Sequence, residues 1–217
     1  VRTVEVEGLG IFEANSSGNL HVKVDPLDAS LNYKNKGNIH TLFPYAGVIT
    51  VLEHTSGDPT FGNIVAGGVM SFSSAEPDSW TAYEGRSTVF NGKDAIPYQD
   101  ELSLTKTTVI AEMYYPTNRD RIVRAFRGQS GYLRSPGCAA IEMACVASGQ
   151  AAAFICMSQK GHELGAAYRI VKNAGGVVVD WSGKSLEDTP YDFNQKYPVV
   201  VAASKAAADW VLDLLNN

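Results

Sequence analysis

The first half of the chain follows the pattern of β-strands, in which apolar residues alternate with polar ones or are enriched in β-branched and aromatic types. Such runs cover residues 20–24, 38–54, 60–74 and 80–96. Within the last run, Glu84-Gly85 and Asn91-Gly92 are dipeptides that favour tight turns, so this run is expected to form a hairpin. The pattern therefore predicts an antiparallel sheet in the first half.

Beyond about Leu104 the pattern changes to strands that alternate with helices. Strand-like apolar runs cover residues 107–115, 151–156, 177–181 and 197–204. Helical patterns cover residues 118–128, 137–149 and 161–176, and a last helix is expected to begin with Ser204 as its N-cap. The sequence thus predicts a layered α+β or α/β fold, with an antiparallel-sheet domain over residues 1–104 and an α/β domain over residues 105–217.

Composition and charge narrow the class of function. The chain has 217 residues and a formal net charge of −5, which argues against a general nucleic-acid-binding protein. An anionic substrate would therefore need metal ions or a local cationic cluster. No apolar run approaches the about 20 residues that span a bilayer, so no membrane interaction is expected. Three cysteines without a CxxC pair favour reduced thiols and a cytoplasmic location.

The segment VDPLDAS, residues 24–30, follows directly after the first strand-like run and contains two closely spaced aspartates. The like charges of Asp25 and Asp28 repel, and each raises the pKa of the other unless a positive charge lies between them. Pro26 turns the chain, so the two carboxylates can converge with the Leu27 carbonyl between them. An all-oxygen set of this kind suits a hard cation such as Mg²⁺. The pair either faces water in a turn or holds a cation.

Three segments of the chain carry longer patterns. Residues 24–33, VDPLDASLNY, resemble the signature DPxDG(T/S)xN(F/Y). Residues 134–155 are similar to the pattern GxAAxxxxxVAxGxxDA, and residues 161–183 to WDxAAGxxIvxEAGGxvxDxxG. Their order and spacing match over residues 7–217. Together the three segments resemble the inositol monophosphatase-like family of Mg²⁺-dependent sugar phosphatases, which includes archaeal enzymes acting on inositol phosphate and fructose bisphosphate.

The resemblance implies the layered αβαβα fold of this family, although the family's N-terminal helices have no match in this sequence. It also implies a hydrolase, a phosphatase of small sugar or polyol phosphate monoesters of the inositol monophosphate or fructose 1,6-bisphosphate type, in which a metal-activated water attacks. Two or three Mg²⁺ ions, which Mn²⁺ can replace, would be its cofactors, and a homodimer its expected form. The alternative is a catalytically impaired relative that binds metal or anions or serves as an assembly subunit.

The same resemblance implies roles for individual residues. The metal ligands would be Glu7, Asp25, the Leu27 carbonyl, Asp28 and Glu163. Glu7, Asp25 and Ser30 would act in catalysis, with Ser30 helping to activate the attacking water. The substrate phosphate would lie near the backbone of Ala29, Ser30, Gly137, Cys138 and Ala139. Because a phosphate dianion repels an anionic nucleophile, this chemistry needs cations that neutralise the phosphoryl oxygens.

Several of these positions depart from the family pattern. Ala29 replaces a glycine, which is costly if its φ is positive; Gly8 replaces a second glutamate, and Glu163 replaces an aspartate. His162 stands where an apolar residue is usual, and it is interpreted as a polar residue at the start of a helix. Cys156 lies near the position of a glutamate that inositol-specific members use, which argues against a preference for inositol. The remaining histidines show no ligand spacing: His21, His40 and His54.

Overall fold

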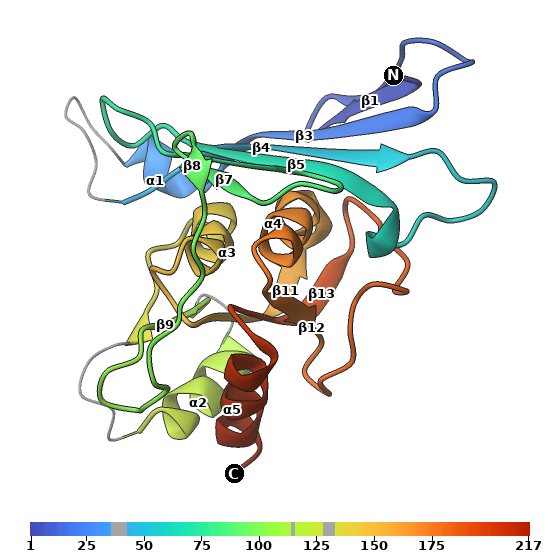
Figure 1. Cartoon of the computed structure of the whole chain (residues 1–217). Coiled ribbons are helices and arrows are strands. Elements are labelled where there is room, and N and C mark those ends of the chain that lie inside the picture. Colours follow the sequence, from blue (N-terminus) through green and yellow to red (C-terminus); the bar gives the residue numbers. More distant parts are fainter. Residues whose placement is uncertain (36–42, 114–115, 128–132) are drawn as a thin grey trace.

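Two sheets and the helices between and beneath them form the layers of the protein (Figure 1). The computed structural model describes residues 1–35, 43–113, 116–127 and 133–217. Helices α3 (Ala139–Ala147) and α4 (Gly161–Asn173) lie between the two sheets, whereas α2 (Pro116–Ala125) and α5 (Lys205–Asn216) cover the outer face of the smaller sheet. The predicted layered fold of strands and helices is confirmed.

The larger sheet has the strand order β2-β1-β3-β4-β5-β6-β7-β8. Its strands are β1 (Thr3–Val6), β2 (Gly10–Glu13), β3 (Leu20–Asp28), β4 (Ala46–Glu53), β5 (Ile64–Ser71), β6 (Ser79–Tyr83), β7 (Val89–Phe90) and β8 (Lys93–Asp94). Neighbouring strands pair antiparallel except β1 and β3, which pair parallel. The antiparallel prediction is wrong at this pair, because the chain turns back through β2 on one side of β1 before it returns as β3 on the other.

The turn between β7 and β8 follows from its residues. Asn91 and Gly92 have φ angles of 48° and 78°, as a two-residue hairpin between β7 and β8 requires, so the predicted turn is confirmed.

A short 3-10 helix, η1 (Phe61–Asn63), leads into β5, and helix α1 (Ser30–Lys34) follows β3. Strand β4 begins only at Ala46, later than the predicted run from residue 38, of which residues 38–42 lie outside the described residues.

The smaller sheet has the order β10-β9-β11-β13-β12. Its strands are β9 (Val109–Ala111), β10 (Leu133–Arg134), β11 (Ala153–Lys160), β12 (Val177–Val179) and β13 (Lys196–Ala202). Strands β10, β9 and β11 pair parallel, and β11, β13 and β12 pair antiparallel. Strand β11 continues past its predicted end at residue 156 to Lys160 and leads directly into α4.

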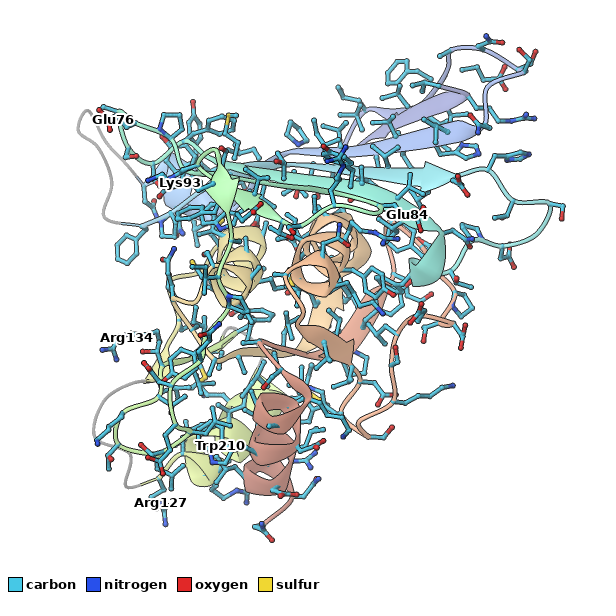
Figure 2. The ribbon with its side chains drawn as sticks, viewed as in Figure 1. Glu76, Glu84, Lys93, Arg127, Arg134 and Trp210 are labelled. Carbon is cyan, nitrogen blue, oxygen red and sulfur yellow. The ribbon has the colours of Figure 1, made fainter. Side chains whose placement is uncertain are left out.

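Side chains fill the space between the layers (Figure 2). The core between the sheets contains large buried side chains such as Phe61, Trp80 and Tyr168. Helices α3 and α4 contact both sheets, so the predicted division into domains at residue 104 stays a prediction. On the opposite face of the larger sheet Ile49 and Met70 are exposed.

Helix termini follow the expected capping chemistry at the end of the chain. The Ser204 hydroxyl accepts a hydrogen bond from the Ala207 amide at 3.1 Å, so the predicted N-cap of α5 is confirmed.

No helix in the described part of the chain combines the length and apolarity that crossing a membrane would need.

Helix α4 packs unusually closely on the larger sheet. A Cβ atom at Gly67 of β5 would lie 2.5 Å from the Ala166 carbonyl oxygen, and one at Gly165 would lie 2.8 Å from Oγ1 of Thr50. Neither distance is possible for a real side chain, so both positions need glycine. The close contact fixes where α4 begins relative to the strands of the larger sheet.

Gly67→Ala should therefore lower the free energy of unfolding by more than about 2 kcal/mol, because the new methyl group must push the α4 backbone away from β5. Gly68→Ala is the matched control, since its Cβ would meet only the Trp80 carbonyl oxygen at 3.9 Å. Urea denaturation of both variants measures the difference. Equal stability of the two variants would contradict the close packing of α4.

Candidate functional site

Four carboxylates from distant parts of the chain meet beside one cavity of about 620 Å³. Asp25 and Asp28 belong to β3, Glu7 follows β1, and Glu163 lies in the first turn of α4. Oxygen atoms of Asp25, Asp28 and Glu163 lie within 4.8 Å of one another. Donor atoms of Glu7, Asp25 and His162 form a second such group within 4.8 Å.

The parallel pairing of β1 and β3 brings Glu7 to the site. Val6 pairs with Val24, and the Glu7 amide donates a hydrogen bond to the Val24 carbonyl at 2.9 Å. Because parallel strands end at the same edge, the residue after β1 lies next to Asp25. Antiparallel pairing would have carried Glu7 to the other end of β3.

A bulge in β3 holds the two aspartates. The register of β3 against β4 shifts between Asp25 and Asp28, and the Leu27 amide donates to Asp25 Oδ1 at 2.9 Å. Asp28 Oδ2 accepts the Ala140 amide at 2.8 Å and the Cys138 thiol at 3.1 Å. The aspartates are only 1% and 5% exposed, so the alternative in which they face water in a turn is wrong. The Leu27 carbonyl as a ligand stays a prediction.

Glu163 faces the aspartates from the start of α4. Its side chain is 13% exposed and accepts a hydrogen bond from the Gln159 side-chain amide. A carboxylate in the first turn is also favoured by the positive end of the helix dipole. The strand β11 and the helix α4 that follows it thus place Glu163 opposite the bulge of β3.

His162 lies at the centre of the carboxylates. Its side chain is 4% exposed, and Nε2 lies 3.6 Å from Glu7, 3.8 Å from Asp25 and 3.5 Å from Glu163. The ring packs edge-on against Phe193, with centroids 5.3 Å apart. His162 does stand at a helix start, as interpreted from the sequence, but it points inward. The one signal in the sequence was a histidine at a position where the family pattern has an apolar residue.

Burial and mutual repulsion dominate the electrostatics of the cluster. Burial, and then the neighbouring carboxylates, raise the pKa of Asp25, Asp28 and Glu163 to about 7 each. Burial lowers the pKa of His162, against the attraction of Glu7 and Asp25. Lys160 lies 3.8 Å from Glu7 at the rim. The negative groups thus outnumber the cations near them, and their oxygens are the donors that Mg²⁺ prefers, so these residues fit a divalent cation.

The loop before α3 forms another wall of the cavity. The Gly137 and Cys138 amides donate to Oε1 of buried Glu142 at 2.5 and 3.2 Å. The Asn32 side-chain amide donates to the Gly137 carbonyl at 3.2 Å and so ties this loop to α1. A phosphate contact through the Gly137 or Cys138 amide would compete with Glu142, and their role stays a prediction.

The structure places most of the predicted phosphate-binding residues at the cavity. Ala29, Ser30, Gly137 and Ala139 line it, whereas Cys138 is fully buried and turns its thiol toward Asp28. Ala29 has φ 65° and ψ 46°, the left-handed conformation that favours glycine. The backbone at Ala29 is therefore strained. This is the cost that the replacement of the family glycine implied for a positive φ.

Sequence reasoning missed several residues that line the same cavity. Glu112 reaches it from the end of β9, and Ser158 and Gln159 from β11. The hydrophobic pattern ended β11 at residue 156, so nothing in the sequence pointed to its polar continuation. Of the other histidines, His21 and His54 lie 3.0 Å apart and do not line this cavity, and His40 lies outside the described residues.

The chain is similar in sequence to a known protein family. The sequence model of the inositol monophosphatase family matches residues 2–217. The chain belongs to the inositol monophosphatase family. Its members are metal-dependent phosphatases that act on small phosphate substrates. No curated protein matches the chain in sequence.

Several solved structures share the fold of this chain. SuhB, an extragenic suppressor protein of Bartonella henselae, is 20% identical with a TM-score of 0.76, and the match covers 99% of this chain and 76% of SuhB. The MJ0109 gene product, an inositol monophosphatase–fructose 1,6-bisphosphatase, is 24% identical with a TM-score of 0.75, covering 98% and 76%. An IMPase of Thermotoga maritima is 23% identical with a TM-score of 0.72, covering 98% and 73%.

Ala29→Gly should raise the free energy of unfolding by about 1 kcal/mol, because glycine removes the left-handed strain. Ala206→Gly is the control, since Ala206 lies exposed in α5, where glycine costs about 1 kcal/mol. Denaturant titration of both variants measures the two opposite shifts. A loss of stability in Ala29→Gly as large as that in Ala206→Gly would contradict the strain at Ala29.

In metal-free protein the stability should fall as the pH rises from about 4 to about 7. Asp25, Asp28 and Glu163 have a pKa of about 7 when folded, against about 4 in the unfolded chain. The folded state therefore binds more protons in this window, and raising the pH removes that stabilisation. Urea midpoints at about pH 5 and about pH 8 measure the effect, and Asp28→Asn should reduce it. A higher midpoint at the upper pH would contradict the clustering of these groups.

Proposed function

We propose that the chain is a Mg²⁺-dependent phosphatase that hydrolyses small sugar or polyol phosphate monoesters. The observation that carries the proposal is the convergence of buried Asp25, Asp28 and Glu163 beside a cavity of about 620 Å³. A cavity of this volume is large enough for a small phosphate ester. Membership of a family of metal-dependent phosphatases supports the same conclusion.

The charge of the site determines how a substrate could bind. A phosphate dianion would be repelled by Glu7, Asp25, Asp28 and Glu163, so the acidic residues must hold cations before they can hold a substrate. Bound Mg²⁺ ions would neutralise phosphoryl oxygens, stabilise the leaving alkoxide and lower the pKa of a water. In this proposal Glu7, Asp25, the Leu27 carbonyl, Asp28 and Glu163 hold the ions.

The attacking water would be positioned on the side of the cavity formed by β1 and α1. Glu7 is about one-third exposed and Ser30 is exposed at the start of α1, and both line the cavity. These two side chains can therefore reach a solvent molecule, whereas Asp25 is buried and its Oδ1 already accepts the Leu27 amide, which leaves Oδ2. We propose that Glu7, Asp25 and Ser30 orient this water, and that Ala29, Ser30, Gly137, Cys138 and Ala139 surround the phosphate.

The remaining wall of the cavity suits the hydroxyl groups of a sugar or polyol. Glu112, Ser158 and Gln159 line it and offer carboxylate, hydroxyl and amide groups. The similar MJ0109 gene product is named as acting on inositol monophosphate and fructose 1,6-bisphosphate, which supports a substrate of this size. Cys156 lies on the same wall and offers no carboxylate, which favours a sugar phosphate over inositol phosphate. A cytoplasmic homodimer, with Mn²⁺ able to replace Mg²⁺, completes the proposal.

Asp25→Asn should lower the rate of phosphate release by at least about a hundred-fold, because it removes one charge from the centre of the cluster. EDTA should abolish the same activity, and added Mg²⁺ should restore it. Asp58→Asn is the matched control, since Asp58 is exposed and does not line the cavity. The assay measures phosphate released from fructose 1,6-bisphosphate and inositol monophosphate.

Full activity of Asp25→Asn, or activity that survives EDTA, would contradict the proposed function. Calorimetric binding of Mg²⁺ by a protein that releases no phosphate from either substrate would instead select the alternative, a non-catalytic family member that binds metal.

A further inference from the structure

The surroundings of His162 differ from those of an ordinary core histidine. The side chain is 4% exposed, and its Nδ1 atom has no hydrogen-bond partner among the described residues. Its Nε2 atom faces oxygens of Glu7, Asp25 and Glu163 at 3.5 to 3.8 Å, which is longer than a hydrogen bond. The nitrogen that faces the carboxylates is therefore not engaged in a full hydrogen bond with them, and because His162 lines the cavity, Nε2 is open to a ligand there.

The spacing of these atoms suits a shared metal ion. Nitrogen and oxygen ligands of first-row divalent metals lie at about 2.1 Å from the ion, so two ligands of one ion can be at most about 4.2 Å apart. Nε2 of His162 lies 3.6 Å from the Glu7 oxygen and 3.8 Å from the Asp25 oxygen. Both separations are below this limit. Both are also longer than a hydrogen bond, so an ion can lie between the atoms.

The two donor groups of the site differ in chemistry. Asp25, Asp28 and Glu163 offer only oxygens, whereas Glu7, Asp25 and His162 combine two carboxylates with an imidazole. All-oxygen sites favour Mg²⁺, whereas an imidazole nitrogen raises the affinity for later first-row transition metals such as Co²⁺ or Zn²⁺. Asp25 belongs to both groups, so the two positions adjoin each other.

We propose that Nε2 of His162 joins Glu7 and Asp25 as a metal ligand, and that this nitrogen makes their cation position prefer a first-row transition metal over Mg²⁺. The inference deepens the proposed function, because it assigns different cations to the two halves of one site. It depends on the proposed function only for the use of these cations in turnover, since binding itself can be measured without a substrate.

Backbone packing holds His162 ready for this role. The Gly161 amide donates to the Gln195 carbonyl at 2.8 Å, and the Tyr191 hydroxyl donates to the Gly161 carbonyl at 3.2 Å. Phe193 packs against the imidazole ring. These contacts fix the ring where its Nε2 atom faces the carboxylates. Lys160, which lies 3.8 Å from the same Glu7 oxygen, is the competing cation at the rim of the site.

The test uses the full chain, freed of metal with a chelator, and titrated separately with Co²⁺ and Mg²⁺ in a calorimeter. His162→Phe keeps a ring against Phe193 and removes both nitrogens, and His162→Gln serves as a second variant should the first fail to fold. We expect the variants to lose at least about ten-fold in Co²⁺ affinity, with a change of less than about three-fold in Mg²⁺ affinity. His54→Asn is the matched control, because His54 pairs with His21 away from the cavity.

A spectroscopic measurement separates coordination from a structural effect. Electron spin echo measurements on the Mn²⁺-loaded protein should show coupling to an imidazole nitrogen, which disappears in His162→Phe and persists in His54→Asn. Absence of nitrogen coupling in the unsubstituted protein, or equal Co²⁺ affinity with and without His162, would overturn the inference. Nitrogen coupling in a protein that hydrolyses no phosphate ester would support the inference and refute the proposed function.

Discussion

Carboxylates that are buried close together repel one another, and the candidate site is built around this repulsion. Burial raises the pKa of all three carboxyl groups most, and charge repulsion adds to it, since Asp28 raises the pKa of Asp25, Glu163 that of Asp28, and Asp25 that of Glu163. The chain opposes the repulsion only in part, through amides that donate to Asp25 and Asp28 and a side-chain amide that donates to Glu163. A divalent cation is the group that would complete the balance, and its binding would stabilise the fold.

Such a cluster can persist only because the backbone around it is held from several sides. The Gly67 contact presses α4 against β5, and the start of α4 sets the position of Glu163. Asn32 ties α1 to the loop before α3, and Glu142 holds two amides of that loop. The residues that shape the site thus include a glycine and two hydrogen-bonding side chains outside the cluster. Their role is to prevent the relaxation that the repulsion would otherwise cause.

Two residues at the site, Ala29 and His162, differ from the family pattern. Ala29 keeps the left-handed backbone of the bulge although its methyl group makes that conformation costly. His162 brings an imidazole into a site whose other donors are oxygens. The first change strains the backbone between β3 and α1, and the second adds a nitrogen donor to a cluster of carboxylates.

The sequence by itself determined the layered class, the type of most elements and the identity of the acidic residues, because periodicity and short motifs are local properties. It could not show that β1 pairs parallel with β3, since strand direction depends on the path of the connecting chain. It could not show that β11 extends to Lys160, because polar residues there are stabilised by pairing with β13. Only the tertiary structure decided that His162 faces Glu7 and Asp25, because burial and orientation arise from packing between segments far apart in the sequence.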